Sequence, residues 1–191
     1  MYKRQGRGTT LLWALQYGLN AKGIEIDLKA LGDFQRHVKK WSKLHRVKHT
    51  FSKGRIGRVK RGDFGQFVQW QPTQTDRWAR LICGDTTETD TVLQKERFDL
   101  LISDLPYGIE FTQTHRRSPI DVVKKAASGW VNALKSGGAM VLAFNSNLPK
   151  KEELVHCFSQ AGLIHQPLEF SHRMSESIVR DVVVFKNLRP S

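Results

Sequence analysis

The segment DLPYG, residues 104–108, places a carboxylate, a proline and an aromatic ring directly after a short apolar run. That run, at residues 98–102, is typical of a strand buried on both faces of a parallel sheet. Because Pro106 has no backbone N–H, the strand must end there. Ligands of open α/β sheets bind at the carboxyl ends of strands, so we expect a binding site at this point. A strand followed by a plain Pro-Gly turn is the alternative.

These residue types suit the activation of an exocyclic amino group on a nucleic-acid base. Such a group is a poor nucleophile, because its lone pair is delocalised into the ring. The carboxylate of Asp104 and the carbonyl of Leu105 could accept its two N–H bonds and direct the lone pair. Pro106 would hold that carbonyl in place, and Tyr107 would stack on a base taken out of its helix. We therefore predict that residues 104–107 are catalytic.

The same segment resembles the signature of the amino-group methyltransferases, (Asp/Asn/Ser)-Pro-Pro-(Tyr/Phe/Trp). Leu105 stands where the signature has its first proline, which removes some backbone stiffness but keeps the carbonyl. The resemblance implies S-adenosylmethionine as the methyl donor and an amino nitrogen as the acceptor.

Three sites upstream follow the order that a nucleoside cofactor would need. A glycine-containing turn at residues 6–9 opens the first helix, Glu25 closes the next strand 17 residues beyond Gly8, and Asp85 closes the strand after that. Glycines allow close approach of the backbone, and an acid at the second strand's end can accept both ribose hydroxyls. Each feature alone is also common as a turn, a strand-end acid or a cap. The predicted cofactor-binding residues are Gly6, Gly8, Thr9, Glu25, Asp85 and Thr86.

Positive charge is concentrated in one stretch of the chain. Lys and Arg number 31 against 18 Asp and Glu, and eleven of these cations lie between Asp33 and Asp63 without a single acid. Because so many cations would repel one another, a polyanion is the expected partner, and a solvated basic face is the alternative. The aromatic residues nearby could be stacking platforms or the apolar underside of the same elements; they are Trp41, Phe51, Phe64, Phe67 and Trp70. The predicted substrate contacts in this stretch are Lys53, Arg55, Arg58 and Lys60.

A second group of predicted substrate contacts lies in the polar segment at residues 172–181. A tight turn between two closing strands would need Gly, Asn or Asp, whereas this segment supplies cations and hydroxyls. Such side chains suit phosphate or ribose oxygens. We expect His172, Arg173 and Arg180 to bind the substrate, with the two arginines on the backbone beside the flipped base. A plain polar hairpin turn is the alternative.

Alternating strands and helices predict a doubly wound, mostly parallel α/β sheet with an antiparallel last strand. A two-stranded basic insertion is expected within residues 46–77. The expected helices lie at residues 9–17, 29–45, 89–95, 119–134 and 150–161. The expected strands lie at residues 22–27, 79–85, 98–102, 137–145, 163–172 and 177–187.

Composition restricts the classes of protein that remain. A chain of 191 residues has room for one α/β domain, and no apolar run reaches the roughly 20 residues of a membrane span. The start MYKRQ lacks the apolar core of a signal peptide. Cys83 and Cys157 form no CxxC pair, and the histidines show no metal-ligand spacing. We expect a reduced, cytoplasmic, metal-free protein; nothing in the sequence predicts its oligomeric state.

The wider pattern resembles the bacterial relatives of the tRNA guanine-N2 methyltransferases, without their RNA-binding THUMP domain. The resemblance rests on GRGTTLLWAL, GIEIDLKAL, CGDTT, SDLPYGIEF and SIVRDVVVF, and covers nearly all of residues 1–191. It implies a single class I methyltransferase domain with a Rossmann-like fold, S-adenosylmethionine as cofactor, and RNA, tRNA above all, as substrate. By position, Gly6 and Gly8 would face the cofactor, Glu25 its ribose and Asp85 its adenine.

Family members have a complete first strand before the glycine turn, where this sequence has only MYKRQ, which is too short and too polar for a central strand. We therefore expect the first strand to be missing at the N-terminus. Three functions remain open: an RNA methyltransferase acting on guanine N2, a DNA adenine-N6 or cytosine-N4 methyltransferase, and a nucleic-acid-binding module that keeps the fold without turnover.

Overall fold

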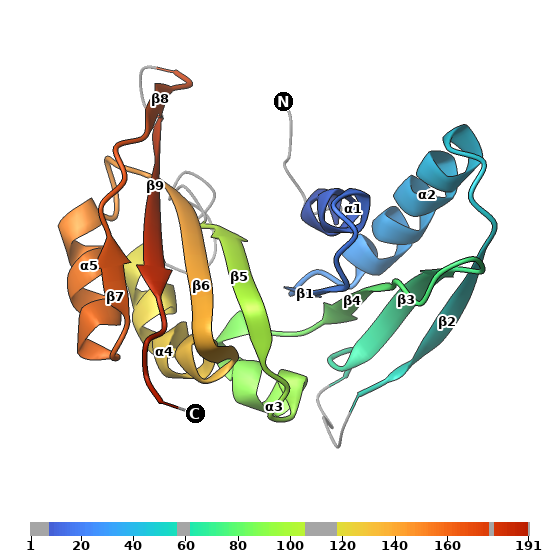
Figure 1. Ribbon diagram of the computed structural model, residues 1–191, viewed down its shortest axis with the longest axis horizontal. Helices are drawn as coiled ribbons and strands as arrows, with labels where there is room; N and C mark the ends of the chain where they lie inside the picture. Colours follow the sequence, from blue (N-terminus) through green and yellow to red (C-terminus); the bar gives the residue numbers. More distant parts are fainter. Residues whose placement is uncertain (1–7, 57–61, 106–117, 176–177, 191) are drawn as a thin grey trace. The chain divides into compact units, whose positions relative to one another are not determined.

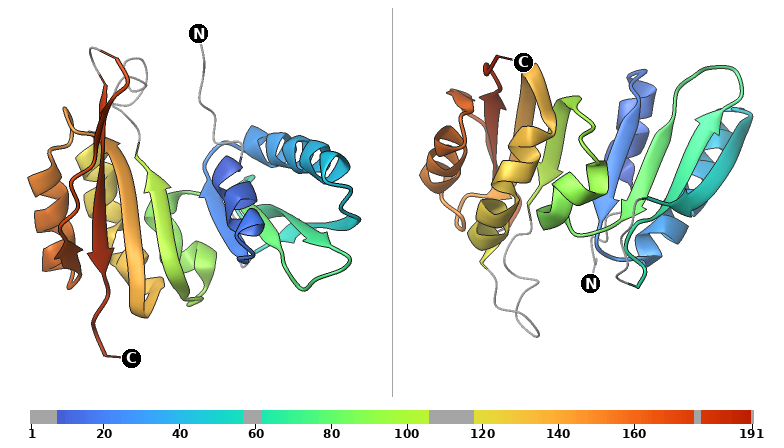
Figure 2. Two further views of the ribbon diagram at one scale, coloured as in Figure 1. Left: turned by 45° about the horizontal axis from the view of Figure 1, so that its top comes forward. Right: turned by 90° about the horizontal axis from the view of Figure 1, so that it is seen from below.

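The computed structural model describes residues 8–56, 62–105, 118–175 and 178–190, which belong to two compact units. Unit 1 comprises residues 1–92 and unit 2 residues 93–191. Each unit contains a mixed sheet with helices packed against it (Figures 1 and 2). The predicted α/β architecture is confirmed in both units.

The sheet of unit 1 has four strands in the order β1-β4-β3-β2. β1 and β4 are parallel, whereas β3 pairs antiparallel with both β4 and β2. The predicted basic insertion is therefore a hairpin that extends the sheet, and residues 57–61 at its turn lie outside the described residues. The elements are α1 (Thr9–Gln16), β1 (Ala21–Glu25), α2 (Lys29–Leu44), β2 (His49–Arg55), β3 (Gln66–Pro72), β4 (Ala79–Cys83) and the 3₁₀ turn η1 (Thr86–Glu88).

Both long helices of unit 1 pack on one face of its sheet, as Figure 1 shows. Apolar residues at helical spacing in α2 face the sheet, and Phe34 and Val38 are fully buried there. Val68 and Trp70 are two residues apart on β3 and meet these helices from the same face of the sheet. The buried indole N–H of Trp70 donates to the Ser42 hydroxyl of α2 at 3.1 Å, so the polar atom that packing removes from water keeps a partner.

The sheet of unit 2 has the order β5-β6-β9-β7, with β8 added along β9. β5 and β6 are parallel, and the last strand β9 is antiparallel to β6, as predicted. The helix α3 (Thr89–Leu93) leads into this unit. Its elements are β5 (Phe98–Asp104), α4 (Pro119–Asn132), β6 (Leu134–Asn145), α5 (Lys151–Gln160), β7 (Ile164–Gln166), β8 (Ser171–Arg173) and β9 (Val179–Lys186).

The helices α4 and α5 share one core with alternate residues of β6 and β9. Met140, Leu142, Val183 and Phe185 point into this core and are fully buried. The prediction that β5 is buried on both faces is wrong, because Leu100 and Ile102 are 42% and 53% exposed. Among the described elements of unit 2, the long helices cover only one face of the strand, and β5 lies at the edge of its sheet.

The domain organisation, membrane spans and metal sites concern the chain as a whole. The single methyltransferase domain over residues 1–191, with its first strand missing, stays a prediction. Among the described residues, no helix is both long and apolar enough to cross a bilayer. In that same part of the chain, no group of His, Cys, Asp and Glu side chains could hold a metal ion.

Candidate functional site

Asp104 is the last residue of β5, and the structure pairs it with an arginine from the final strand. The Nη2 atom of Arg180 lies 2.9 Å from Oδ2 of Asp104, and both side chains are partly exposed, at 32% and 47%. The predicted base-activating carboxylate and one predicted substrate cation therefore form an ion pair with each other. An arginine in this position fixes the direction of one carboxylate oxygen and balances its charge.

Strand pairing explains how Arg180 reaches Asp104 across an intervening strand. In the parallel pairing of β5 and β6, Asp104 lies beside Ala143, and Ala143 lies beside Val182 of β9. Arg180 is two residues from Val182, so it projects on the same face one step further along the strand. Arg180 itself lies beside Asn145 of β6, so its long side chain reaches diagonally past the small Ala143 to Asp104. Sequence analysis missed the contribution of Ala143, because nothing local marks it.

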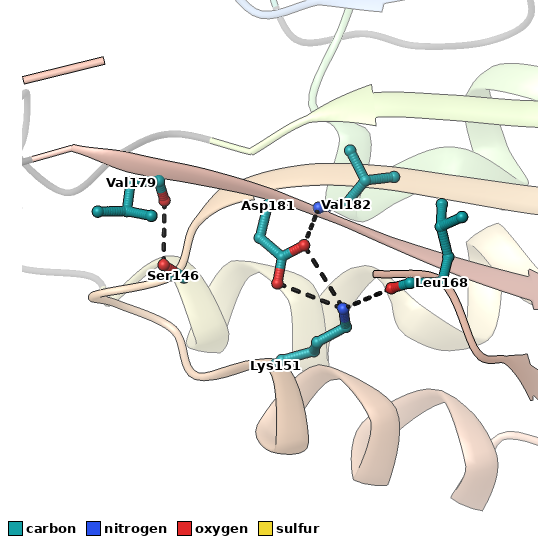
Figure 3. Close-up of polar contacts among 6 residues, drawn as sticks. All are labelled: Ser146, Lys151, Leu168, Val179, Asp181 and Val182. Carbon is teal, nitrogen blue, oxygen red and sulfur yellow. Dashed lines mark hydrogen bonds and ion pairs between the residues drawn. The ribbon is translucent and has the colours of Figure 1, made fainter. Parts of the chain in front are cut away.

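The segment that carries Arg180 is held in place by two sets of polar contacts (Figure 3). At the end of β6, the Ser146 hydroxyl donates to the carbonyl of Val179 at 3.1 Å. On the other side of β9, Lys151 of α5 contacts the Asp181 carboxylate at 3.3 Å and donates to the carbonyl of Leu168 at 3.0 Å. Successive residues of a strand point to opposite faces, so anchoring Asp181 to α5 directs Arg180 to the opposite face.

The predicted turn at residues 172–181 is shorter in the structure, because its two ends pair as strands. His172 lies opposite Arg180 and Arg173 lies opposite Val179 in the β8–β9 ladder. Residues opposite each other share a face, so His172 and Arg180 project on one side and Arg173 on the other. Of the three predicted contacts, only Arg180 reaches Asp104. His172 shares a face with Arg180 but lies on the side of β9 away from β6, and Arg173 projects from the other face.

Leu105, the next predicted catalytic residue, has its backbone held by a hydrogen bond to β6. The amide of Leu105 donates to the carbonyl of Ala143 at 2.8 Å, which continues the β5–β6 ladder one residue beyond the strand. The Leu105 side chain is buried in the core of unit 2. Pro106 and Tyr107 lie outside the described residues.

Three of the predicted cofactor residues, Glu25, Asp85 and Thr86, lie at the carboxyl edge of the sheet in unit 1. β1 and β4 are parallel, with Glu25 beside Cys83, so Glu25 and Asp85 follow neighbouring strand ends. The Oε1 atom of Glu25 accepts from the amide of Ile26 at 2.9 Å. Burial raises the pKa of Glu25 above the ordinary carboxyl range, with a nearby carboxylate adding to the shift and the backbone hydrogen bonds opposing it.

Asp85 begins the turn η1 through a cap. Its Oδ1 atom accepts from the amide of Thr87 at 2.8 Å, and the carbonyl of Thr86 accepts from the Thr89 hydroxyl. These contacts fix the backbone after β4 and orient the Asp85 carboxylate at the sheet edge. The predicted adenine contact thus also has a structural role.

Gly8 has a structural requirement that sequence analysis did not reveal. It precedes α1 with a φ of 70°, in the left-handed region that favours glycine. A Cβ placed there would lie 2.5 Å from Cδ2 of the fully buried Phe34. Thr9 is the first residue of α1, and Gly6 lies outside the described residues.

The basic stretch divides between α2 and the β2–β3 hairpin. Lys53 and Arg55 are exposed on β2, where Arg55 also donates to the carbonyl of Gly62 at 2.9 Å. Arg58 and Lys60 lie outside the described residues. The aromatic residues of this stretch lie on both faces of the sheet. The rings of Trp41, Phe51, Phe64 and Trp70 belong to the helix-covered core or pack against it, and Phe67 belongs to the opposite face of the sheet.

Comparison with solved structures finds methyltransferases of low sequence identity. A TehB-like SAM-dependent methyltransferase from Corynebacterium glutamicum matches with a TM-score of 0.55 and 14% identity, over 95% of this chain and 76% of that one. TrmN from Thermus thermophilus matches with a TM-score of 0.55 and 16% identity, over 96% of this chain and 42% of that one. An rRNA methylase from Streptococcus thermophilus matches with a TM-score of 0.54 and 13% identity, over 96% of this chain and 82% of that one.

No protein-family model and no curated protein sequence matches the chain. At these identities the structural likeness shows the fold alone, and this protein covers less than half of the Thermus chain. The chain therefore has the Rossmann-like fold of the class I methyltransferases, as the sequence predicts.

Proposed function

We propose that the protein is an S-adenosylmethionine-dependent methyltransferase that modifies an exocyclic amino group of a nucleic-acid base, with guanine N2 in tRNA or another RNA as the favoured target. The observation that carries this proposal is the Asp104 carboxylate, at the carboxyl end of β5 and held by Arg180. Fold alone does not define a function, whereas the oriented carboxylate at this site has the chemistry that amino-group methylation needs.

The chemistry of Asp104 matches what an amino nucleophile requires. A carboxylate with a fixed orientation can accept an N–H bond from the base and hold the nitrogen lone pair in the direction of attack. Since Arg180 already compensates its charge, the carboxylate needs little rearrangement when the base binds. Tyr107 would stack on that base, and the Leu105 carbonyl would accept the second N–H bond.

The residues of unit 1 fit a nucleoside cofactor by their chemistry. Glu25 and Asp85 present two carboxylates at neighbouring strand ends, where ribose hydroxyls and an adenine amino group need acceptors. The unfavourable burial of the Glu25 carboxylate is consistent with a group retained for a ligand. S-Adenosylmethionine supplies an electrophilic methyl group on a sulfonium. Transfer of that methyl group to the amino nitrogen would leave the uncharged thioether of S-adenosylhomocysteine, and Asp104 would accept the proton that the nitrogen releases.

A nucleic-acid substrate is supported by charge, and RNA by the printed name of one structural neighbour. The net charge of +13 favours a polyanionic partner. The Streptococcus neighbour is named an rRNA methylase. We assign Lys53, Arg55 and the predicted Arg58 and Lys60 to phosphate contacts, and Arg173 to the RNA backbone.

Labelled methyl transfer tests the proposal directly. Purified protein with radiolabelled S-adenosylmethionine is offered total tRNA, rRNA and duplex DNA, and the labelled nucleoside is identified by mass spectrometry. We expect N2-methylguanosine in RNA. Label confined to DNA adenine or cytosine would contradict the RNA assignment, and RNA binding without any label would indicate a binding module without turnover.

Two carboxylates on the same strand provide a matched pair of variants. Asp104→Ala should lower turnover by at least about a hundredfold, which is typical of losing one preorganised polar group, with cofactor affinity unchanged. Asp99, near the other end of β5, is exposed and ion-paired with Lys135 at 2.9 Å. Asp99→Ala should leave turnover unchanged. An equal loss in both variants would show that the carboxylates act through strand stability.

A further inference from the structure

The face of the unit 1 sheet opposite α1 and α2 carries a row of polar and cationic side chains. The strand register aligns Lys22 of β1 with Arg80 of β4, Arg80 with Gln69 of β3, and Gln69 with Ser52 of β2. Because the neighbouring residues in each strand turn toward the helices, this row lies on the other face. We name these four residues, with Phe67 and Trp78, the Arg80 row.

Arg80 lies at the centre of this row, between two aromatic rings. Its guanidinium carbon is 4.6 Å from the centroid of Phe67 and 5.6 Å from that of Trp78. The Arg80 Nε atom also donates to Oε1 of Gln69 at 2.8 Å, which fixes the plane of the guanidinium. The ammonium of Lys22 lies 5.9 Å from the Trp78 centroid. Aromatic and cationic side chains thus alternate over a short distance on a sheet.

The described elements of unit 1 leave most of this row accessible. A Cβ on Gly84 would lie 3.2 Å from Val92 and 3.5 Å from Ile24, so the residues after β4 cover the carboxyl end of this face. Arg80, Gln69 and Trp78 remain partly exposed and Ser52 is exposed. Within the four strands of unit 1, all of them described, the one carboxylate is Glu25. Glu25 is three residues from Lys22 in β1, so it points to the opposite face, toward the helices.

We propose that the Arg80 row binds single-stranded RNA, with a base stacked on Trp78 and with Lys22 and Arg80 contacting phosphates. Base stacking on aromatic rings combined with nearby cations is the general means of binding single strands. The absence of carboxylates within the row removes the repulsion that a phosphate backbone would meet. The exposed Thr50 and Ser52 hydroxyls of β2, which share this face, can bond a ribose 2′-hydroxyl, which favours RNA over DNA. The inference concerns binding alone and does not depend on methyl transfer.

Tryptophan fluorescence tests contact at Trp78. The probe is a dodecamer of uridylate titrated into the full chain, with binding followed by quenching and, independently, by anisotropy of a labelled dodecamer. In Trp78→Phe, quenching should be lost, while the affinity from anisotropy stays within about threefold because a ring remains. Trp13 is 55% exposed on α1, on the other side of the sheet, so Trp13→Phe should retain the quenching. Quenching that persists in Trp78→Phe and disappears in Trp13→Phe would overturn the proposal.

A nearly isosteric change tests the cations without disturbing the fold. Gln69→Glu keeps the acceptor for Arg80 Nε but adds a negative charge to the row, and should weaken dodecamer binding by roughly tenfold at low salt. Gln16, exposed on α1, provides the same chemical change on the helix side, and Gln16→Glu should change affinity less than about twofold. Equal weakening in both variants would mean that only net charge matters and would refute the assigned surface.

The salt dependence separates phosphate contacts from general attraction. The slope of log affinity against log salt is negative. Lys22→Ala should bring it closer to zero by about 0.7, the value for one phosphate of a single strand. Lys125→Ala, on the exposed side of α4, removes the same charge and should leave the slope unchanged. Stronger binding of a deoxythymidylate dodecamer than of the RNA would contradict the choice of RNA. An unchanged slope in Lys22→Ala would contradict the phosphate contact.

Discussion

At the scale of single residues, the ion pair between Asp104 and Arg180 distinguishes two roles for the closing arginines. Arg180 contacts Asp104, whereas Arg173 projects from the opposite face of the β8–β9 ladder. We assign Arg180 to positioning the carboxylate and Arg173 to the RNA backbone. The two arginines should therefore affect different kinetic constants.

The prediction for these arginines is a split between kcat and KM. Arg180→Ala should lower kcat by about tenfold or more, because Asp104 loses the partner that orients it, and Arg180→Lys should recover part of this loss. Arg173→Ala should raise the KM for RNA and leave kcat unchanged. Steady-state kinetics with the methylated RNA measure both constants. A rise in KM alone for Arg180→Ala would instead make Arg180 an RNA contact.

Glu25 gives a prediction about stability and pH. Because its pKa is raised in the folded protein, its contribution to stability is present below the ordinary carboxyl range and is lost as pH rises through the raised pKa. Glu25→Gln removes this titration, so the variant should lose less stability than the parent protein across that interval. Urea unfolding at a series of pH values measures the difference.

The same Glu25→Gln variant should bind S-adenosylmethionine more weakly, because an amide offers the ribose hydroxyls one carbonyl oxygen in place of two carboxylate oxygens. Calorimetric titration at neutral pH measures that affinity. A variant with unchanged cofactor affinity and the altered pH profile would make Glu25 a purely structural acid.

At the scale of elements, α5 and β9 are joined by the pair of Lys151 and Asp181. The two side chains are 24% and 14% exposed, so the ion pair is largely shielded from water. Lys151→Met should remove the cationic partner of Asp181 and lower the free energy of unfolding by about 1–3 kcal/mol. Lys150→Met, next to it and exposed, should change stability by less than about 0.5 kcal/mol. Urea unfolding compares the two, and equal effects would show that the pair contributes nothing specific.

At the scale of the whole molecule, the excess of positive charge predicts strongly salt-dependent binding to RNA. A quadruple variant tests this, with Ala in place of Lys53, Arg55, Arg58 and Lys60. It should decrease the magnitude of the negative slope of log affinity against log salt. The decrease should be just under one unit for each duplex phosphate that the variant no longer neutralises. Cofactor affinity should be unchanged. A slope equal to that of the parent protein would mean that these cations form only a solvated face.

The sequence by itself determined the features that depend on neighbouring residues. Apolar periodicity located the helix at Lys29–Leu44 to within one residue, and Pro106 marked the end of the strand at Asp104. The alternation of strands and helices was sufficient for the α/β fold class. The charge run from Arg36 to Arg61 was readable by counting alone.

Only the tertiary structure decided which distant residues meet and which face of a strand is covered. Asp104 and Arg180 are 76 residues apart, and their contact depends on the pairing of three strands, with Ala143 between them. Alternation shows that Phe67 and Trp70 point to opposite faces, but the position of the helices decides which one is buried. Such outcomes require the register of non-local pairs, which a local pattern does not encode.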